Sequence, residues 1–139
     1  MTTDLHEDKE HRRRLFKMED IFQLAVGACV MAIPIAYTEE VWNLGAALPP
    51  GQIMLIFGVS LLTLAGFVRF LVYRDGVAGH WRDFILRVAT AYMMTIAISM
   101  MMLVLIDKGP GDGLAVAIKR AVLIAYPASF AATAVDYFR

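Results

Sequence analysis

Long apolar stretches separated by short polar connections dominate the pattern of this chain. Four such stretches occupy about residues 22–42, 51–73, 84–106 and 114–138. Each has about 20 residues or more, enough for a helix to cover the ~30 Å hydrocarbon core of a bilayer. The connections NLGAALPP, RDGVAGHWRD and DKGPGDG contain the Gly and Pro residues that end helices. The pattern predicts an all-α polytopic membrane protein whose four transmembrane helices run antiparallel to their chain neighbours.

The composition indicates that lipid surrounds these stretches. Of the 139 residues, 59% are apolar and 19% are charged, and the mean hydropathy is +0.60. Such a chain is too apolar for a soluble domain of this size. We expect a polar, basic tail over residues 1–19 and a four-helix transmembrane domain over residues 20–139. The tail lacks the apolar run and the small-residue cleavage site of a signal peptide.

Basic residues predict the orientation in the membrane. The tail has five Lys or Arg residues and the second connection has Arg74 and Arg82, whereas the first connection has none and the third has only Lys108. By the positive-inside rule, the N-terminus, the second connection and the C-terminus are cytoplasmic. We therefore expect a multi-pass protein of the bacterial cytoplasmic (inner) membrane.

Charged side chains within the spans are the candidate functional residues, because hydrocarbon makes them costly. The predicted topology gathers them into two layers, one near each membrane face. The outer layer contains Glu39, Glu40, Lys119 and Arg120, and the inner layer contains Arg69, Arg87 and Asp136. The long basic side chains can also reach the head groups or pair with the acids. Charge pairing alone would therefore account for both layers without a function.

The spacing of small residues singles out Glu40 among these charges. Ala28, Ala32, Ala36 and Glu40 recur at every fourth position, so a continuous helix would place them on one stripe that ends in an acid. On that stripe Glu40 would face the bundle or a cavity, where a carboxylate can bind a cation or a proton. Glu39, rotated ~100° from it, is expected to contact solvent or a partner at the rim.

The fourth span repeats this arrangement, and the first and fourth spans each contain a proline. Ala128 and Ala132 precede Asp136 at intervals of four residues, which predicts a small face for close helix packing. Pro34 and Pro127 lack an N–H group, so each frees a main-chain carbonyl of the preceding turn. Such a carbonyl can coordinate an ion, but a simple helix kink is the favoured interpretation.

Other chemistries are not indicated by the sequence. There is no G-x-S-x-G, H-E-x-x-H or C-x-x-C motif and no phosphate-binding Gly-rich loop, so we expect neither an enzyme nor a cofactor. His6 and His11 lie in the tail without fixed geometry, so no metal site is expected. The acids among the basic tail residues argue against nucleic acid as a partner. Cys29 is the single cysteine, which excludes an intrachain disulfide.

Two runs of the sequence resemble a known family. The run PIAYTEEVWNLG is similar to the T-x-E-x-W-x-x-G signature of a family of bacterial integral membrane proteins of unknown function, and YPASFAATAVD is similar to its P-A-S-F/I-G-A stretch. The matching positions are Thr38, Glu40, Trp42 and Gly45, while Ala131 stands where the family more usually has glycine. The resemblance implies a helical membrane protein and again singles out Glu40. Many members are longer, which suggests that a short chain completes its structure by self-association.

Two functional hypotheses follow. In the first, a homo-oligomer in the lipid bilayer forms a small-ion (cation) channel or transporter with Glu40 at its outer mouth and with Glu39 and Asp136 as secondary polar sites. In the alternative, the protein is a non-conducting membrane scaffold or accessory subunit in which Glu40 pairs with Lys119 or Arg120. A continuous polar path would favour the channel, and a dry, alanine-packed axis would favour the scaffold. A lipid-handling enzyme is disfavoured because Glu40 and Asp136 are expected on opposite membrane faces.

Overall fold

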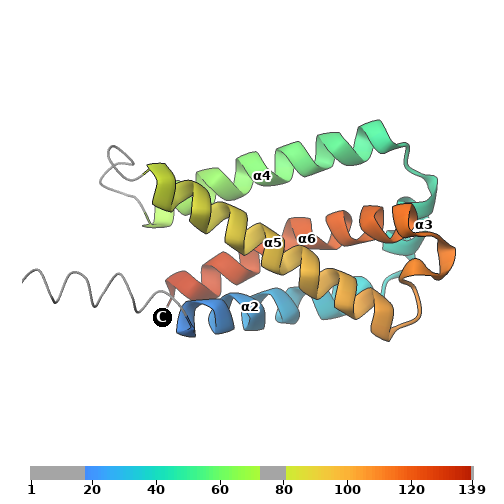
Figure 1. The fold of residues 1–139 in the computed structure, drawn as a ribbon, viewed down its shortest axis with the longest axis horizontal. Coiled ribbons are helices and arrows are strands. Elements are labelled where there is room, and N and C mark those ends of the chain that lie inside the picture. The colour runs from blue at the N-terminus through green and yellow to red at the C-terminus, as the bar shows by residue number, and fades with distance from the viewer. Residues whose placement is uncertain (1–17, 73–80, 139) are drawn as a thin grey trace, which may run out of the picture.

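The computed structural model describes residues 18–72 and 81–138 of the chain. Within these ranges the structure is helical with short connections and has no strand, which confirms the expected all-α class (Figure 1). The elements are α2 (Glu19–Ala36), α3 (Glu39–Ala47), α4 (Pro50–Val72), α5 (Trp81–Leu105), η2 (Pro110–Asp112) and α6 (Leu114–Tyr137). Most of the expected basic tail, including His6 and His11, lies outside the described residues, as does Arg74.

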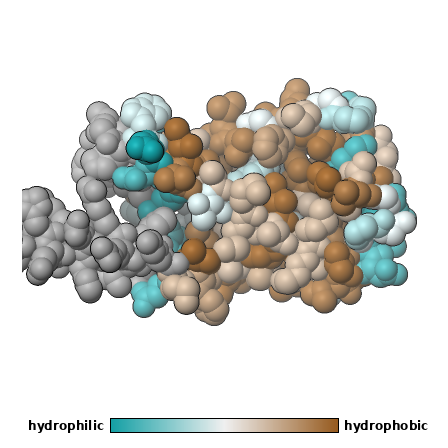
Figure 2. Space-filling model, viewed as in Figure 1, coloured by the Kyte–Doolittle hydropathy of each residue, from teal (hydrophilic) through white to brown (hydrophobic). Residues whose placement is uncertain are grey.

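Four of these helices are long and apolar enough to cross a membrane, namely α2, α4, α5 and α6. The last three agree closely with the expected spans at 51–73, 84–106 and 114–138. In Figure 1 the four helices run along the length of the bundle, and α3 lies at one end of it. Figure 2 shows a broad hydrophobic band over the bundle, with hydrophilic residues concentrated toward its two ends. This distribution is the one that a bilayer requires of a spanning protein.

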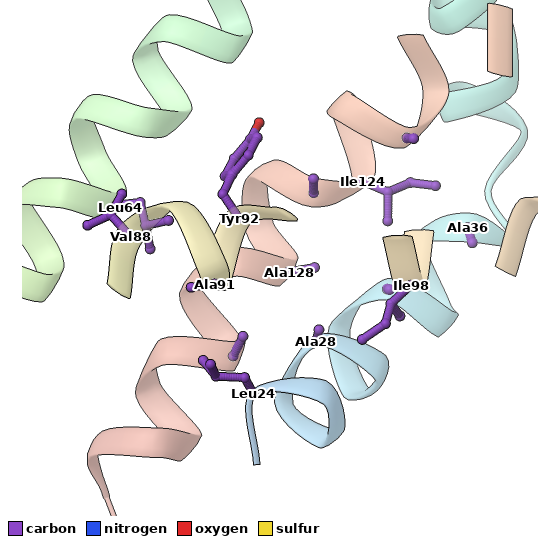
Figure 3. Close-up of a cluster of buried hydrophobic side chains, with 14 of the residues drawn as sticks. Leu24, Ala28, Ala36, Leu64, Val88, Ala91, Tyr92, Ile98, Ile124 and Ala128 are labelled. Carbon is purple, nitrogen blue, oxygen red and sulfur yellow. The ribbon is translucent and has the colours of Figure 1, made fainter. Parts of the chain in front are cut away.

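Helix α6 is the centre of the bundle, since it packs against α2, α3, α4 and α5. Its contact with α2 is made by small residues and brings the two backbones together. A Cβ atom added at Gly27 would lie only 2.7 Å from the Ala131 carbonyl oxygen. Figure 3 shows Ala28 of α2 and Ala128 of α6 within the same buried cluster. We call this contact the α2–α6 seam; its fully buried alanines are Ala28, Ala32, Ala36, Ala121, Ala125, Ala128 and Ala132.

The first span differs from the sequence expectation. Helix α2 ends at Ala36 and a separate helix begins at Glu39, so the expected span of about 22–42 is not one helix. Thr38 between them has an extended backbone, with φ −86° and ψ 131°. Pro34 therefore lies in the last turn of α2, where its missing N–H weakens the helix, rather than in its middle. Pro127, in contrast, lies inside α6, which continues on both sides of it.

This break corrects the interpretation of Glu40. The stripe of small residues on α2 ends at Ala36, the last residue of that helix. Glu40 belongs to the first turn of α3 and is exposed. The four-residue spacing that linked it to the alanines has no structural meaning across a helix break, because helical periodicity holds only within one continuous helix. The expectation that Glu40 faces the bundle interior is therefore wrong.

Candidate functional site

The turn from α2 into α3 is held by two side chains that lie just beyond the end of α2. The Thr38 hydroxyl donates a hydrogen bond of 2.7 Å to the Ile35 carbonyl. The Trp42 indole N–H donates one of 2.7 Å to the Ala36 carbonyl. Carbonyls in the last turn of a helix have no donor within the helix. Thr38 and Trp42 therefore supply those donors, and by doing so they fix the direction in which α3 leaves α2. We call this turn the elbow (residues 35–45).

The elbow packs against α6 where Gly45 contacts Arg120. Gly45 is buried, and a side chain there would collide with the aliphatic stem of Arg120. Only glycine thus allows α3 to approach α6 this closely. The close approach brings the main chain of α3 within reach of the Arg120 guanidinium group.

Arg120 is a buried arginine, with 4% of its surface exposed. Its Nε donates to the Trp42 carbonyl at 3.2 Å, and its Nη1 donates to the Lys108 carbonyl at 2.8 Å. Nη1 also lies 2.8 Å from Asp112 Oδ2, and the Asp112 side chain is 60% exposed. A buried charge is costly unless it is paired and hydrogen-bonded. Arg120 meets that condition by joining α3, the α5–α6 connection and η2 to α6.

Two lysines complete this end of the bundle. Lys119 Nζ donates a hydrogen bond of 2.9 Å to the carbonyl of Leu48, the residue that follows α3. Lys108 Nζ lies 4.7 Å from the centroid of the Trp42 ring, a cation–π distance. Three basic side chains, of Lys108, Lys119 and Arg120, therefore contact α3 or the residue that follows it and stabilise its backbone and its tryptophan. We call this region, from the elbow to the first turns of α6, the α3 end.

The two acids of helix α3 itself lie on the outside of the α3 end. Glu39 and Glu40 are both exposed and occupy the first turn of α3, where a negative charge is favourable because it opposes the helix dipole. Within the described part of the chain, neither carboxylate has a hydrogen-bond or ion-pair partner. The pairing of Glu40 with Lys119 or Arg120 that the scaffold hypothesis expected is absent from those residues. Lys119 and Arg120 bind main-chain carbonyls instead, and Arg120 also pairs with Asp112.

The opposite end of the bundle contains a different arrangement of charge. Arg87 Nη2 of α5 forms an ion pair with Asp136 Oδ2 of α6. The Asp136 side chain is 3% exposed and the Arg87 side chain 20% exposed. The carboxylate of Asp136 is thus already engaged by a guanidinium group, which makes it a poor site for a second cation. Arg69 of α4 is exposed, in keeping with a side chain that extends toward the head groups.

No cluster of three or more His, Cys, Asp or Glu side chains suited to a metal ion occurs in residues 18–72 and 81–138. The functional candidates of the sequence therefore separate into two groups. Lys119, Arg120, Arg87 and Asp136 have partners that explain them structurally. Glu39 and Glu40 remain as exposed acids on a rigidly held helix.

Sequence reasoning missed the capping roles of Thr38 and Trp42, which the T-x-x-x-W spacing beyond a helix end could have indicated.

The arrangement defines a class of protein. Four helices of membrane length, with apolar outer surfaces and charges gathered at the two ends, form an integral membrane bundle. The family described as "Putative integral membrane protein (DUF2391)" matches residues 2–136, so the chain belongs to that family. This match confirms the family resemblance drawn from the sequence. No curated protein and no solved structure matches the chain significantly.

Proposed function

We propose that this integral membrane protein is a non-catalytic, non-conducting scaffold or accessory subunit that presents the acidic surface of α3 at one membrane face. The observation that carries the proposal is the α2–α6 seam. Its alanines are fully buried, and the seam brings the two helix backbones into contact at Gly27. A path for hydrated ions needs polar lining groups and open space, and this interface offers neither.

The α3 end supports the same proposal. A binding surface gains affinity when it is held rigid before the partner arrives. Hydrogen bonds from Thr38, Trp42, Lys119 and Arg120 fix the backbone at α3 and its two ends. Glu39 and Glu40 then lie on a surface whose position is set by the bundle. A partner with a complementary basic segment could pair with these carboxylates without reordering α3.

Reconstitution into liposomes tests whether the protein conducts. We expect the flux of K⁺, Na⁺ and H⁺ through proteoliposomes to equal that of protein-free liposomes, while an added ionophore shows that the assay responds. The flux should be the same for the wild type and for Glu40→Gln. A cation flux that requires the protein and disappears in Glu40→Gln would overturn the scaffold proposal.

A small-cation path formed between copies of the chain is the second candidate, because Glu40 is exposed and without an ion-pair partner among the described residues. In a homo-oligomer this carboxylate could line the mouth of a path between subunits. Glu39→Gln is the matched control for Glu40→Gln, since both acids lie in the first turn of α3. The channel candidate expects that Glu40→Gln abolishes flux, that Glu39→Gln retains it, and that both keep the assembled size on a gel-filtration column.

We also propose that the protein lies in the bacterial cytoplasmic membrane with the α3 end outside, as the distribution of basic residues favours. Cysteine labelling tests the orientation, because Cys29 is the single cysteine of the chain. In a Cys29→Ser background, an impermeant maleimide added to intact cells should label Asn43→Cys in α3. It should label Arg82→Cys at the opposite end only after lysis. The reverse pattern would contradict the orientation.

A further inference from the structure

Most buried hydroxyl groups of the bundle are satisfied by their own helix. Each donates to a carbonyl three or four residues earlier, which is the usual solution for Ser and Thr in a membrane helix. The bonds are Thr95 to Ala91 at 2.6 Å, Ser99 to Thr95 at 2.7 Å, Ser129 to Tyr126 at 2.9 Å and Thr133 to Ser129 at 3.0 Å. These hydroxyls need no further partner.

Ser60 of α4 and Tyr92 of α5 are different. Ser60 is 0% exposed and Tyr92 is 2% exposed. The side-chain oxygen of each is fully buried and has no hydrogen-bond partner among residues 18–72 and 81–138. The two hydroxyls lie close enough to influence one another, but no direct bond between them meets the distance and angles of a hydrogen bond. A tyrosine hydroxyl cannot bond to its own helix as serine can, because the ring carries it away from the backbone; the ring of Tyr92 extends away from Ala91 and Ala128 in Figure 3.

The contact between α4 and α5 fixes this hydroxyl pair in place. The rings of Phe57 and Tyr92 pack edge to face, with centroids 5.3 Å apart. Ser60 follows Phe57 by one helical turn and so lies on the same side of α4. Both Ser60 and Tyr92 are near the middle of their helices, which places the pair near the middle of the hydrocarbon core. An unsatisfied hydroxyl there costs several kcal/mol.

A third group, which lacks its helical donor, lies by register at the same level on α6. Pro127 has no N–H, so the Leu123 carbonyl lacks its helical donor. Helices α4 and α6 run in the same direction (Figure 1), and Phe67 contacts Phe130 across them, with centroids 5.6 Å apart. Ser60 precedes Phe67 on α4 by about two helical turns, and Leu123 precedes Phe130 on α6 by the same interval. Ser60 and Leu123 therefore lie at about the same level. The carbonyl thus comes from the α6 face that is turned toward α4.

We propose that Ser60 and Tyr92 bind one buried water molecule in the middle of the membrane, and that the Leu123 carbonyl is its third partner. Buried waters in proteins typically make about three hydrogen bonds to groups that are otherwise unsatisfied. Two hydroxyls and one carbonyl supply that number of donors and acceptors. The water joins α4, α5 and α6 at a level where packing alone leaves these groups without partners.

Infrared difference spectroscopy of the protein in lipid tests this site. A buried water gives an O–H stretching band that shifts when ordinary water is replaced by water with a heavier oxygen isotope. We expect such a band in the wild type and its loss in both Ser60→Ala and Tyr92→Phe. Tyr126→Phe is the matched control, because Tyr126 also lies within a span but is 37% exposed; it should retain the band.

Thermal unfolding in detergent gives an independent readout. Ser60→Ala and Tyr92→Phe should each lower the midpoint temperature of unfolding. The midpoint of the double variant should be no lower than that of the more affected single variant, because either change removes the same water. The proposal is overturned if the wild type has no isotope-sensitive band, or if both variants keep it. It is also overturned if a high-resolution structure shows a direct Ser60–Tyr92 hydrogen bond with no water between them.

Discussion

The two ends of this bundle use buried charge in different ways. At the α3 end, buried Arg120 donates to the main-chain carbonyls of Trp42 and Lys108, and its one carboxylate partner, Asp112, is mostly exposed. At the opposite end, Arg87 pairs with the buried carboxylate of Asp136. The first arrangement fixes the path of the backbone, and the second joins two helices through their side chains.

The difference explains which acids remain available. Asp136 is paired with Arg87, whereas Glu39 and Glu40 stay unpaired within the described residues because the nearby Lys119 and Arg120 bind carbonyls and Asp112 instead. A buried arginine that binds main-chain carbonyls cannot be compensated by changing its partner, because the carbonyl is present whatever residue carries it. A side-chain ion pair can be replaced as a unit. Substitutions at the two ends should therefore differ in size and in whether a second change can rescue them.

Arg120→Met should have the largest effect. It removes two hydrogen bonds from a charged donor, to the carbonyls of Trp42 and Lys108, and the ion pair with Asp112; a hydrogen bond to a charged group contributes about 1.5–3 kcal/mol. We expect a loss of about 3 kcal/mol or more in the free energy of unfolding, measured by denaturant titration in micelles. Lys119→Met is the matched control, because Lys119 serves one carbonyl and is half-buried. An equal loss in the two variants would contradict the central role of Arg120.

At the opposite end, substituting Arg87 should cost more stability than substituting its partner Asp136. Arg87→Met leaves the carboxylate of Asp136, 3% exposed, without its partner, and breaking a buried pair in this way costs roughly 3 kcal/mol. Asp136→Asn should cost less, about 1–2 kcal/mol, because the 20% exposed Arg87 can extend toward the head groups. The double variant should recover part of the loss seen in Arg87→Met. Additive losses in the unfolding titration would show that the two side chains do not interact.

The sequence was sufficient for most of the fold. Apolar length and Gly/Pro connections located α4, α5 and α6 to within about three residues at each end, because a spanning helix must be long and apolar. The end of α2 was not predictable in the same way. Residues 22–37 remain apolar up to the break, and the break itself is stabilised by side chains that follow it, Thr38 and Trp42.

The site was predictable only in part, for a related reason. The acids and bases were identified as notable because charge is costly in a membrane, and Arg87 and Asp136 were placed in the same layer. The partners of Arg120 could not be identified, since they are main-chain carbonyls of residues 42 and 108. Hydrogen bonds to the backbone leave no residue-type signal in a sequence. The spacing that pointed Glu40 inward assumed a helix that Thr38 interrupts.

Trp42→Phe tests the elbow with a smaller expected effect. The phenyl ring keeps most of the packing but removes the indole N–H, so the Ala36 carbonyl loses its donor. We expect a loss of about 1 kcal/mol in the same unfolding titration. Thr38→Val should cost less, because the Ile35 carbonyl keeps the main-chain N–H of Thr38 as a donor at 3.1 Å. A larger loss for Thr38→Val than for Trp42→Phe would show that the Thr38 hydroxyl, rather than the Trp42 indole, is the main side-chain donor that stabilises the elbow.

Glu40→Gln should have the smallest effect on stability, and it separates folding from function. An exposed acid in the first turn of a helix contributes below about 1 kcal/mol through the helix dipole, and Glu39→Gln should match it because both acids share that turn. If unfolding of Glu40→Gln stays near the wild type while Arg120→Met is strongly destabilised, the carboxylate is free to serve a partner. If Glu40→Gln instead loses as much stability as Arg120→Met, the acid belongs to the packing of the α3 end, and the contrast between the two ends fails.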